Sequence, residues 1–195
     1  SGAGEILASI AGALKSRSGS LTLNGETFLP KSPRQAIKKK IAYCSSDRKK
    51  DFTLRMSNVG RPSCQLWFEK NKPDIIVIDQ LDKINVSGTY ARTDEKLRQI
   101  YTSVREIAKR RNCAVIAISQ ASADAHNRNS ISFDQMENSK TGKAAEADLI
   151  IGIGRNANSD LENKIRTLCV SKNKINGYHG EPVCTIRRGI SRYEV

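Results

Sequence analysis

The composition favours a folded domain with a polyanionic partner and excludes a membrane-spanning chain. The 195 residues are 38% hydrophobic and only 5% aromatic, which is enough for one core of Ile, Leu, Val and Ala. No apolar run reaches the roughly 18 residues of a membrane helix, and the start lacks the basic and apolar regions of a secretory signal. The net charge of +13 favours a polyanion such as nucleic acid, with an ordinary solvated surface as the alternative.

The expected elements before residue 45 are short. In chain order they are a helix over 4–15, a hairpin turning at Asn24-Gly25, a helix from Pro33 to Lys39 and a buried strand over 41–44. The helix over 4–15 repeats apolar residues on one face, Asn-Gly is the preferred two-residue hairpin turn, and Ser-Pro is a typical helix start. The stretch from 45 to 61 is polar and is the best candidate for a junction.

Strands and helices alternate in the rest of the chain. The expected elements are helices over 62–71 and 93–111, and strands over 74–79, 113–119, 148–154, 164–172 and 181–188. This alternation predicts a single α/β domain over 1–195 with a largely parallel sheet, whose ligands bind at the carboxyl ends of the strands. The side chains expected to be buried in adjacent strands are Ile75, Val77, Val115, Ile116, Ile118, Leu149 and Ile151.

The cysteines and histidines do not have the spacing of a metal site. Cys44, Cys64, Cys113, Cys169 and Cys184 are scattered without a CxxC pair, and the two histidines lie far apart in the sequence. Free thiols in a reducing cytoplasm fit this pattern best.

The most informative stretch is PDIIVIDQL, an apolar strand that ends in Asp79. P-loop ATPases place a carboxylate beside the magnesium of their nucleotide in this way. Mg²⁺ keeps much of its water shell, so one or two carboxylates suffice, and Asp79 would hold the ion directly or through water. Many buried strands end in Asp, and a capping role for Asp79 is the alternative.

Polar residues that follow the later strands extend this hypothesis. AVIAISQ places Gln120 just after a second apolar strand, where its side chain could detect a γ-phosphate. VSKNKINGYHG carries Lys172 and Lys174 two residues apart, a spacing that directs both side chains to one side of a strand.

Residues 60–195 resemble the C-terminal part of the RecA-like motor domain of hexameric replicative DNA helicases of the DnaB and phage type. The matching order is IVIDQL, a strand ending in Gln, AD before an apolar strand with Arg155, and K-x-[RK]-x-x-G. The resemblance implies that Asp79 is the Walker B carboxylate and Gln120 the γ-phosphate sensor. It implies that Lys172 and Lys174 reach the neighbouring subunit's nucleotide, although Lys174 replaces the usual arginine finger and lacks its planar fork.

The same resemblance implies Mg²⁺ and ATP as cofactors, a homo-oligomeric ring, single-stranded DNA in its channel and a cytoplasmic protein. The loops over 83–93 and 121–141 match those that face DNA, so Lys83, Arg92 and Arg128 are the candidate DNA contacts. Solvated surface charge is the alternative for each of these cations.

Residues 1–58 resemble instead a sugar-importer ABC ATPase, through SPRQAI and IAY followed by SxDRKKD. In that family, a phosphate-binding loop such as Gly2-Ala3-Gly4 continues with Lys and Ser or Thr. Here Glu5 and Ile6 follow, so the loop lacks the lysine that neutralises phosphate and the hydroxyl that binds Mg²⁺. Backbone amides at a helix start still attract an anion.

Asp47 has two interpretations. It occupies the place of the glutamate that activates water in helicases, and it also belongs to the ABC-like SxDRKK match. Two family resemblances in one chain suggest a chimera. Three functions follow: a helicase-type motor domain deficient in ATP hydrolysis, a non-catalytic nucleic-acid or anion-binding module, and an engineered scaffold without evolved activity.

Overall fold

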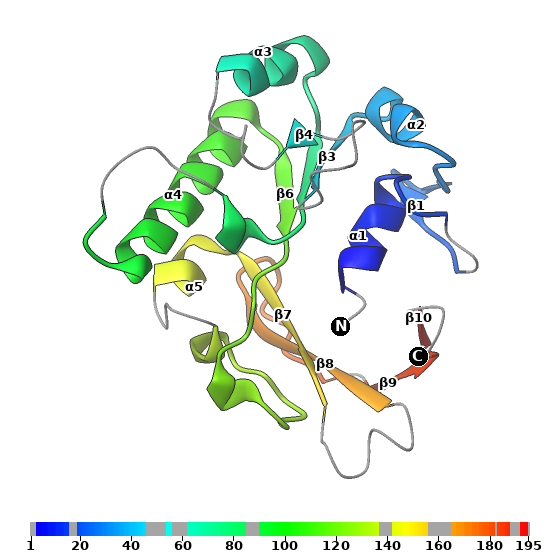
Figure 1. The fold of residues 1–195 in the computed structure, drawn as a ribbon. Helices are drawn as coiled ribbons and strands as arrows, with labels where there is room; N and C mark the ends of the chain where they lie inside the picture. Colours follow the sequence, from blue (N-terminus) through cyan, green and yellow to red (C-terminus); the bar gives the residue numbers. More distant parts are fainter. Residues whose placement is uncertain are drawn as a thin grey trace. The chain divides into compact units, whose positions relative to one another are not determined.

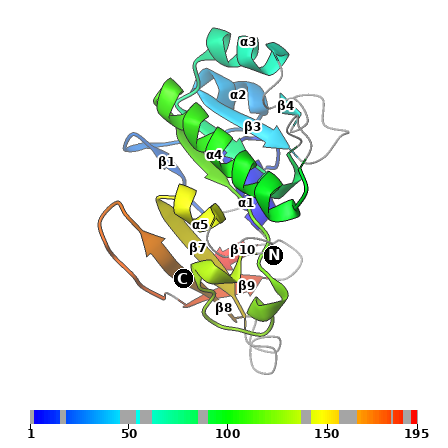
Figure 2. The same cartoon turned by 90° about the vertical axis from the view of Figure 1, so that its left-hand side faces the viewer.

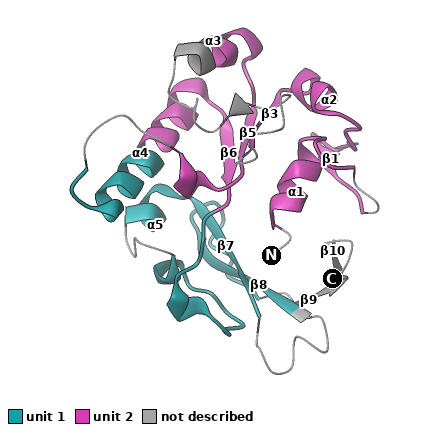
Figure 3. Ribbon diagram, viewed as in Figure 1, with its two compact units in different colours: residues 1–2, 90–102, 119–195 teal, residues 3–89, 103–118 magenta. Residues whose placement is uncertain are grey.

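The computed structural model resolves the chain into two compact units (Figures 1 and 3). Unit 1 comprises residues 1–2, 90–102 and 119–195, and unit 2 comprises residues 3–89 and 103–118. The residues described are 3–15, 19–45, 54–55, 62–84, 90–136, 142–155, 165–181, 183–187 and 192–194. That the whole chain is a single domain stays a prediction.

Unit 2 contains a parallel sheet of four strands in the order β4-β3-β5-β6. The strands are β3 (Ile41–Ser45), β4 (Leu54–Arg55), β5 (Ile75–Ile78) and β6 (Ala114–Ala117). Every residue of β3 is buried, as are Ile76, Val77 and Ile78 in β5. Because successive residues of a strand point to opposite faces, both faces of the central strands are covered. The predicted α/β fold with a parallel sheet is therefore confirmed.

Three short elements of unit 2 form where the sequence predicts them. They are α2 (Pro33–Lys38), α3 (Pro62–Asn71) and the hairpin β1 (Thr22–Leu23) with β2 (Glu26–Thr27). The 3₁₀ helix η2 (Leu81–Lys83) was not predicted. Asn24 and Gly25 both take positive φ, 54° and 82°, as a type I′ turn requires. Helix α3 lies beside the end of α4, where Arg111 stands 5.4 Å from the centroid of the Phe68 ring (Figures 1 and 2).

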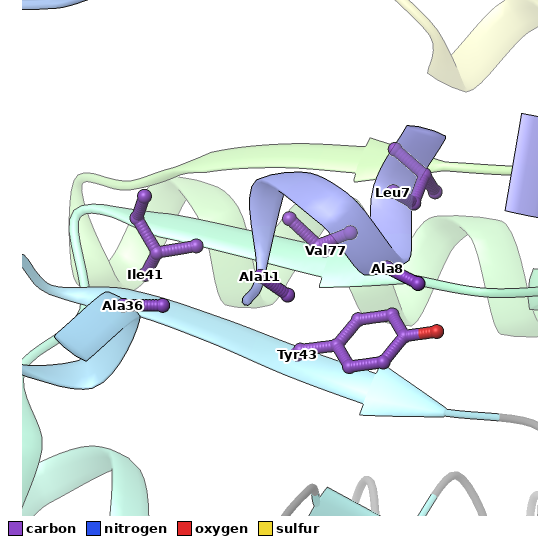
Figure 4. Packing of buried hydrophobic residues seen from close by; sticks show 7 residues of the cluster. All are labelled: Leu7, Ala8, Ala11, Ala36, Ile41, Tyr43 and Val77. Atoms are coloured by element: carbon purple, nitrogen blue, oxygen red, sulfur yellow. The ribbon is translucent and has the colours of Figure 1, made fainter. Parts of the chain in front are cut away.

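Helix α1 (Ala3–Ile10) packs on the sheet through small and apolar side chains (Figure 4). Its buried residues Leu7 and Ala8 join the cluster that contains Tyr43 and Val77. The helix ends earlier than the expected residue 15, because Gly12 has a φ of +67°. This left-handed residue is the usual helix terminator.

Helix α4 (Thr93–Arg111) has the predicted bounds and the predicted inner face. Its buried residues are Leu97, Ile100, Tyr101 and Val104. Acidic residues occupy its first turn and three cations its last turn, an arrangement that complements the helix dipole. In the parts of the chain described here, no helix has the length and apolar character needed to cross a membrane.

Unit 1 contains an antiparallel sheet in the order β10-β9-β8-β7. The strands are β7 (Leu149–Gly154), β8 (Ile165–Asn173), β9 (Val183–Arg187) and β10 (Arg192–Glu194). The unit also holds α5 (Gly142–Glu146) and the 3₁₀ helices η3 (Ala123–Ala125) and η4 (Phe133–Gln135). An apolar run has the same period in either strand direction, so the sequence did not reveal this antiparallel part.

Of the seven side chains expected to be buried, Val77 is buried, Ile75, Val115 and Ile118 are half-buried, and the expectation is wrong at the other three. Val77 is fully buried, whereas Ile116, Leu149 and Ile151 are 41%, 42% and 51% exposed. Among the described strands, β6 and β7 each stand at the margin of a sheet and pair on one side only. A marginal strand has fewer neighbours to cover it than a central strand does. Strands β6 and β7 also belong to different sheets, so they are not adjacent.

Candidate functional site

Asp79 lies at the carboxyl end of β5, as its position after IIVI predicts. Its backbone N–H donates a hydrogen bond to the carbonyl of Cys44 at 2.9 Å. Beside it, β3 ends in Ser45, which is only 5% exposed. After Asp79 the chain turns sharply, because Gln80 adopts the left-handed conformation with φ of 59°. This non-glycine conformation is uncommon and is found repeatedly at functional sites.

The first turn of α1 lies against the Asp79 carboxylate. A Cβ built on Gly4 would lie 3.6 Å from Asp79 Oδ1, so the carboxylate lies just beyond the side of the helix that a glycine leaves open. Ala3 and Gly4 are helical, and Glu5 occupies the first turn. Gly2 and Asp47, the other two residues predicted for this region, lie outside the described residues.

These groups match part of an Mg²⁺–nucleotide site. Mg²⁺ needs few protein carboxylates because it keeps several waters, and Asp79 supplies one beside a helix start that favours anions. No group of three or more His, Cys, Asp and Glu side chains forms a metal cluster in the described part of the chain. The lysine and hydroxyl of a complete phosphate-binding loop are missing from the sequence after Gly4.

Gln120 is exposed and follows β6 by three residues. The carboxyl ends of β5 and β6 are paired, since the N–H of Ile118 donates to the carbonyl of Ile78 at 3.1 Å. Gln120 belongs to unit 1, whereas Asp79 belongs to unit 2. That the two side chains face one phosphate therefore stays a prediction.

Lys172 and Lys174 do not form the expected matched pair. Lys172 is half-buried within β8 and its Nζ donates to the carbonyl of Ala144. Lys174 is exposed and lies beyond the end of β8 at Asn173, where its backbone N–H bonds to the Asp148 carbonyl at 2.8 Å. Residues two apart in a strand point to the same side, but this rule does not apply to Lys174 because the strand has already ended.

The three candidate DNA-contacting cations are exposed but differ in setting. Lys83 ends η2 in unit 2, whereas Arg92 and Arg128 belong to unit 1. Arg92 makes two hydrogen bonds of 3.0 Å to the Asp94 carboxylate. An exposed ion pair of this kind contributes little free energy and does not prevent Arg92 from meeting a phosphate.

Two glycines of β7, which were not identified from the sequence, leave room for the Arg128 loop to approach the strand closely. A Cβ on Gly154 would collide with the carbonyl oxygen of Asn129, and one on Gly152 would lie 2.6 Å from that of Ile131. The N–H of Arg155 also donates to the carbonyl of Arg128 at 2.8 Å. The signal in the sequence is the alternation GIG at the end of the strand, which permits close approach of another backbone.

Comparison with known proteins gives the family. The family described as the DnaB-like helicase C-terminal domain matches residues 28–194. A solved DnaB-like replicative helicase, studied with its interactions with primase, is 18% identical with a TM-score of 0.57. That match covers 68% of this chain and 34% of the other, so the chain spans about a third of that helicase's length.

The family match also begins well before residue 60, where the helicase-like segment was expected to start. It begins at residue 28, so residues 28–58, which were expected to belong to an ABC ATPase-like segment, fall inside the match to the helicase family. At 18% identity the structural likeness supports the RecA-like fold alone. The family match covers most of the sequence, and the chain therefore belongs to the DnaB-like helicase C-terminal domain family.

Proposed function

We propose that this chain is a helicase motor-domain derivative that binds the phosphates of a nucleotide weakly and does not hydrolyse it. The observation that carries the proposal is the place of the Asp79 carboxylate beside the first turn of α1, where a Cβ built on Gly4 would lie 3.6 Å from Asp79 Oδ1. A helix start and an Mg²⁺-type carboxylate meet there, as nucleotide binding requires. Mg²⁺ and ATP are the proposed ligands, with Asp79 holding the metal and Ala3 and Gly4 offering backbone amides.

The proposed loss of hydrolysis follows from Glu5. A carboxylate in the first turn stabilises α1 through the helix dipole, but it repels a phosphate that approaches the same helix end. When bound, Mg²⁺ would neutralise part of the phosphate charge. No lysine follows Gly4 to neutralise the rest, and a phosphoryl transition state depends on such positioned charge.

The other helicase residues are proposed in the roles that the resemblance implies. Gln120 would detect the γ-phosphate, Asp47 would serve as the base toward water, and Lys172 and Lys174 would act toward a neighbouring subunit. The hydrogen bond of Lys172 to the Ala144 carbonyl favours a structural contribution of Lys172. The exposure of Lys174 favours it as the residue that reaches the neighbouring subunit.

Single-stranded DNA and a homo-oligomeric ring are the proposed partners, in the cytoplasm. The net charge of +13 and the exposed cations of the Lys83 and Arg128 loops support a polyanion. The alternative function, a non-catalytic nucleic-acid or anion-binding module, is favoured by the same charge together with the incomplete loop. Origin as a chimera with an ABC-type segment over 1–58, or as an engineered scaffold, stays a hypothesis, and the family match that begins at residue 28 includes the motifs on which the ABC resemblance rests.

A titration with a fluorescent ATP analogue, with and without Mg²⁺, tests the proposal. We expect weak, Mg²⁺-dependent binding that Asp79→Asn reduces and Asp74→Asn leaves unchanged. Asp74 is a suitable control because it precedes the same strand β5 and pairs with Lys40 at 3.7 Å on the surface. Binding that is equally strong without Mg²⁺ and in Asp79→Asn would contradict the proposed site.

A further inference from the structure

Lys143 is a fully buried cation in unit 1. Its exposed fraction is 0%, and it is the largest fully buried side chain among the described residues. Lysine is almost never buried completely unless its ammonium group has partners, because removing the charge from water is costly. The contacts of Lys143 therefore indicate which parts of the unit it stabilises.

The ammonium group of Lys143 reaches two elements that lie outside its own short helix. Nζ is 3.4 Å from Ser119 Oγ and 5.5 Å from the centroid of the Tyr101 ring on α4. Ser119 Oγ in turn lies 3.5 Å from the carbonyl oxygen of Gln120, the next residue. Lys143 thus holds the segment that presents Gln120.

Helix α5, which carries Lys143, has two further hydrogen bonds, one to α4 and one to β8. Glu146 Oε1 accepts a hydrogen bond from Thr102 Oγ1 on α4 at 3.3 Å. The Ala144 carbonyl accepts one from Lys172 Nζ on β8. The five residues of α5 therefore join the segment before Gln120, α4 and the Lys172 region of β8.

We propose that Lys143 is a positioning residue that fixes Ser119 and Gln120 and couples them, through α5, to Lys172. This inference rests on the proposed function, because it assigns Gln120 and Lys172 to one nucleotide-responsive system. A whole buried ion pair replaced by apolar side chains of similar volume often leaves stability unchanged or improved, so a buried charge is weak evidence for a role in stability. Stability alone therefore does not require a lysine here.

The test uses the nucleotide-free protein, so it does not depend on whether ATP binds. Lys143→Met removes the charge at nearly constant volume, and Ser119→Ala removes the hydroxyl that Lys143 contacts. Lys109→Met is the matched control, since Lys109 is exposed and pairs with Glu106 on α4. The first readout is the NMR resonance of the Gln120 side-chain amide, with Gln135 of η4 as the internal reference.

We expect Lys143→Met and Ser119→Ala both to shift and sharpen the Gln120 resonance while Gln135 is unaffected. The second readout is acetylation by acetic anhydride, mapped by mass spectrometry. In Lys143→Met, Lys172 should react roughly fivefold faster, the factor of one ordinary hydrogen bond, while exposed Lys174 should not change.

Unchanged Gln120 resonances in both variants, or an unchanged Lys172 rate, would overturn the proposal. If Lys143→Met does not fold, Ser119→Ala alone decides through the Gln120 resonance. Failure of wild-type protein to bind nucleotide would contradict the proposed function and leave these two readouts to judge the role of Lys143.

Discussion

Truncation of two isoleucines on neighbouring strands tests the described burial of the parallel sheet. Ile78 in β5 is 1% exposed and Ile116 in β6 is 41% exposed. Changing Ile to Ala removes about three carbon groups, each contributing about 0.8 kcal/mol when buried. Ile78→Ala should therefore cost about 2.4 kcal/mol for transfer alone, and up to roughly 5 kcal/mol when a cavity remains.

Ile116→Ala should be much milder. About three fifths of that side chain is buried, so the expected loss is at most about 1.4 kcal/mol, with little cavity at a solvent-facing position. The sequence alone predicted a fully buried residue here, for which the cost would have been roughly 2–5 kcal/mol. The two expectations are far enough apart to be separated by experiment.

Urea denaturation of the two variants, followed by circular dichroism, measures the difference. The slopes with urea should match that of the wild-type chain, so that the midpoints report stability directly. A loss for Ile116→Ala as large as that for Ile78→Ala would refute the reasoning, because it would mean that β6 is covered as fully as β5.

Three further predictions follow from other parts of the molecule. Gly154→Ala should displace the loop at Asn129 and raise amide exchange there, since the new Cβ would collide with the Asn129 carbonyl oxygen; unchanged exchange would contradict the close approach. Changing Lys83, Arg92 and Arg128 together to Ala should weaken binding of a labelled single-stranded oligonucleotide. The plot of log binding constant against log salt concentration should lose a slope of about −2, from about −0.7 for each of the phosphate contacts. Binding curves by anisotropy that are identical for both proteins would exclude these loops as the contact surface. Burial raises the pKa of the Cys113 thiol, Arg111 lowers it and Asp74 raises it, with a net increase; mass-mapped alkylation at pH 8 should be slower than in the urea-unfolded chain and should accelerate as the pH rises, because only the thiolate reacts.

Most of the fold was accessible from local sequence signals. Asn24-Gly25 at the hairpin, Pro33 at a helix start and the regular apolar spacing of 93–111 each act within a few residues, so the sequence predicts them directly. The exposure of Ile116 and Ile151 was not accessible. It depends on where each strand stands in its sheet, and that position is set by pairing over long sequence distances.

The candidate site was accessible in part for the same reason. A carboxylate after a buried parallel strand has a defined place, and Asp79 occupies it. Lys172 and Lys174 were expected to point to one side of the same strand, because the sequence did not show that β8 ends between them. Their roles stay a prediction. Lys143 follows a glycine in a polar stretch and looks like an ordinary surface lysine. Only its packing against Tyr101 and Ser119 distinguishes it.

Restoring the missing loop residues tests the central claim most directly. Insertion of Lys-Thr between Gly4 and Glu5 supplies the phosphate-binding lysine and the Mg²⁺-binding hydroxyl, and insertion of Ala-Ala at the same place is the matched control for the longer loop. Steady-state ATP turnover and Mg²⁺-dependent ATP binding are measured for the unmodified chain and both insertion variants, each with and without Asp79→Asn. We predict no turnover above buffer for the unmodified chain, and tighter Mg²⁺-dependent ATP binding for the Lys-Thr variant only. Clear turnover by the unmodified chain that Asp79→Asn abolishes would contradict the account.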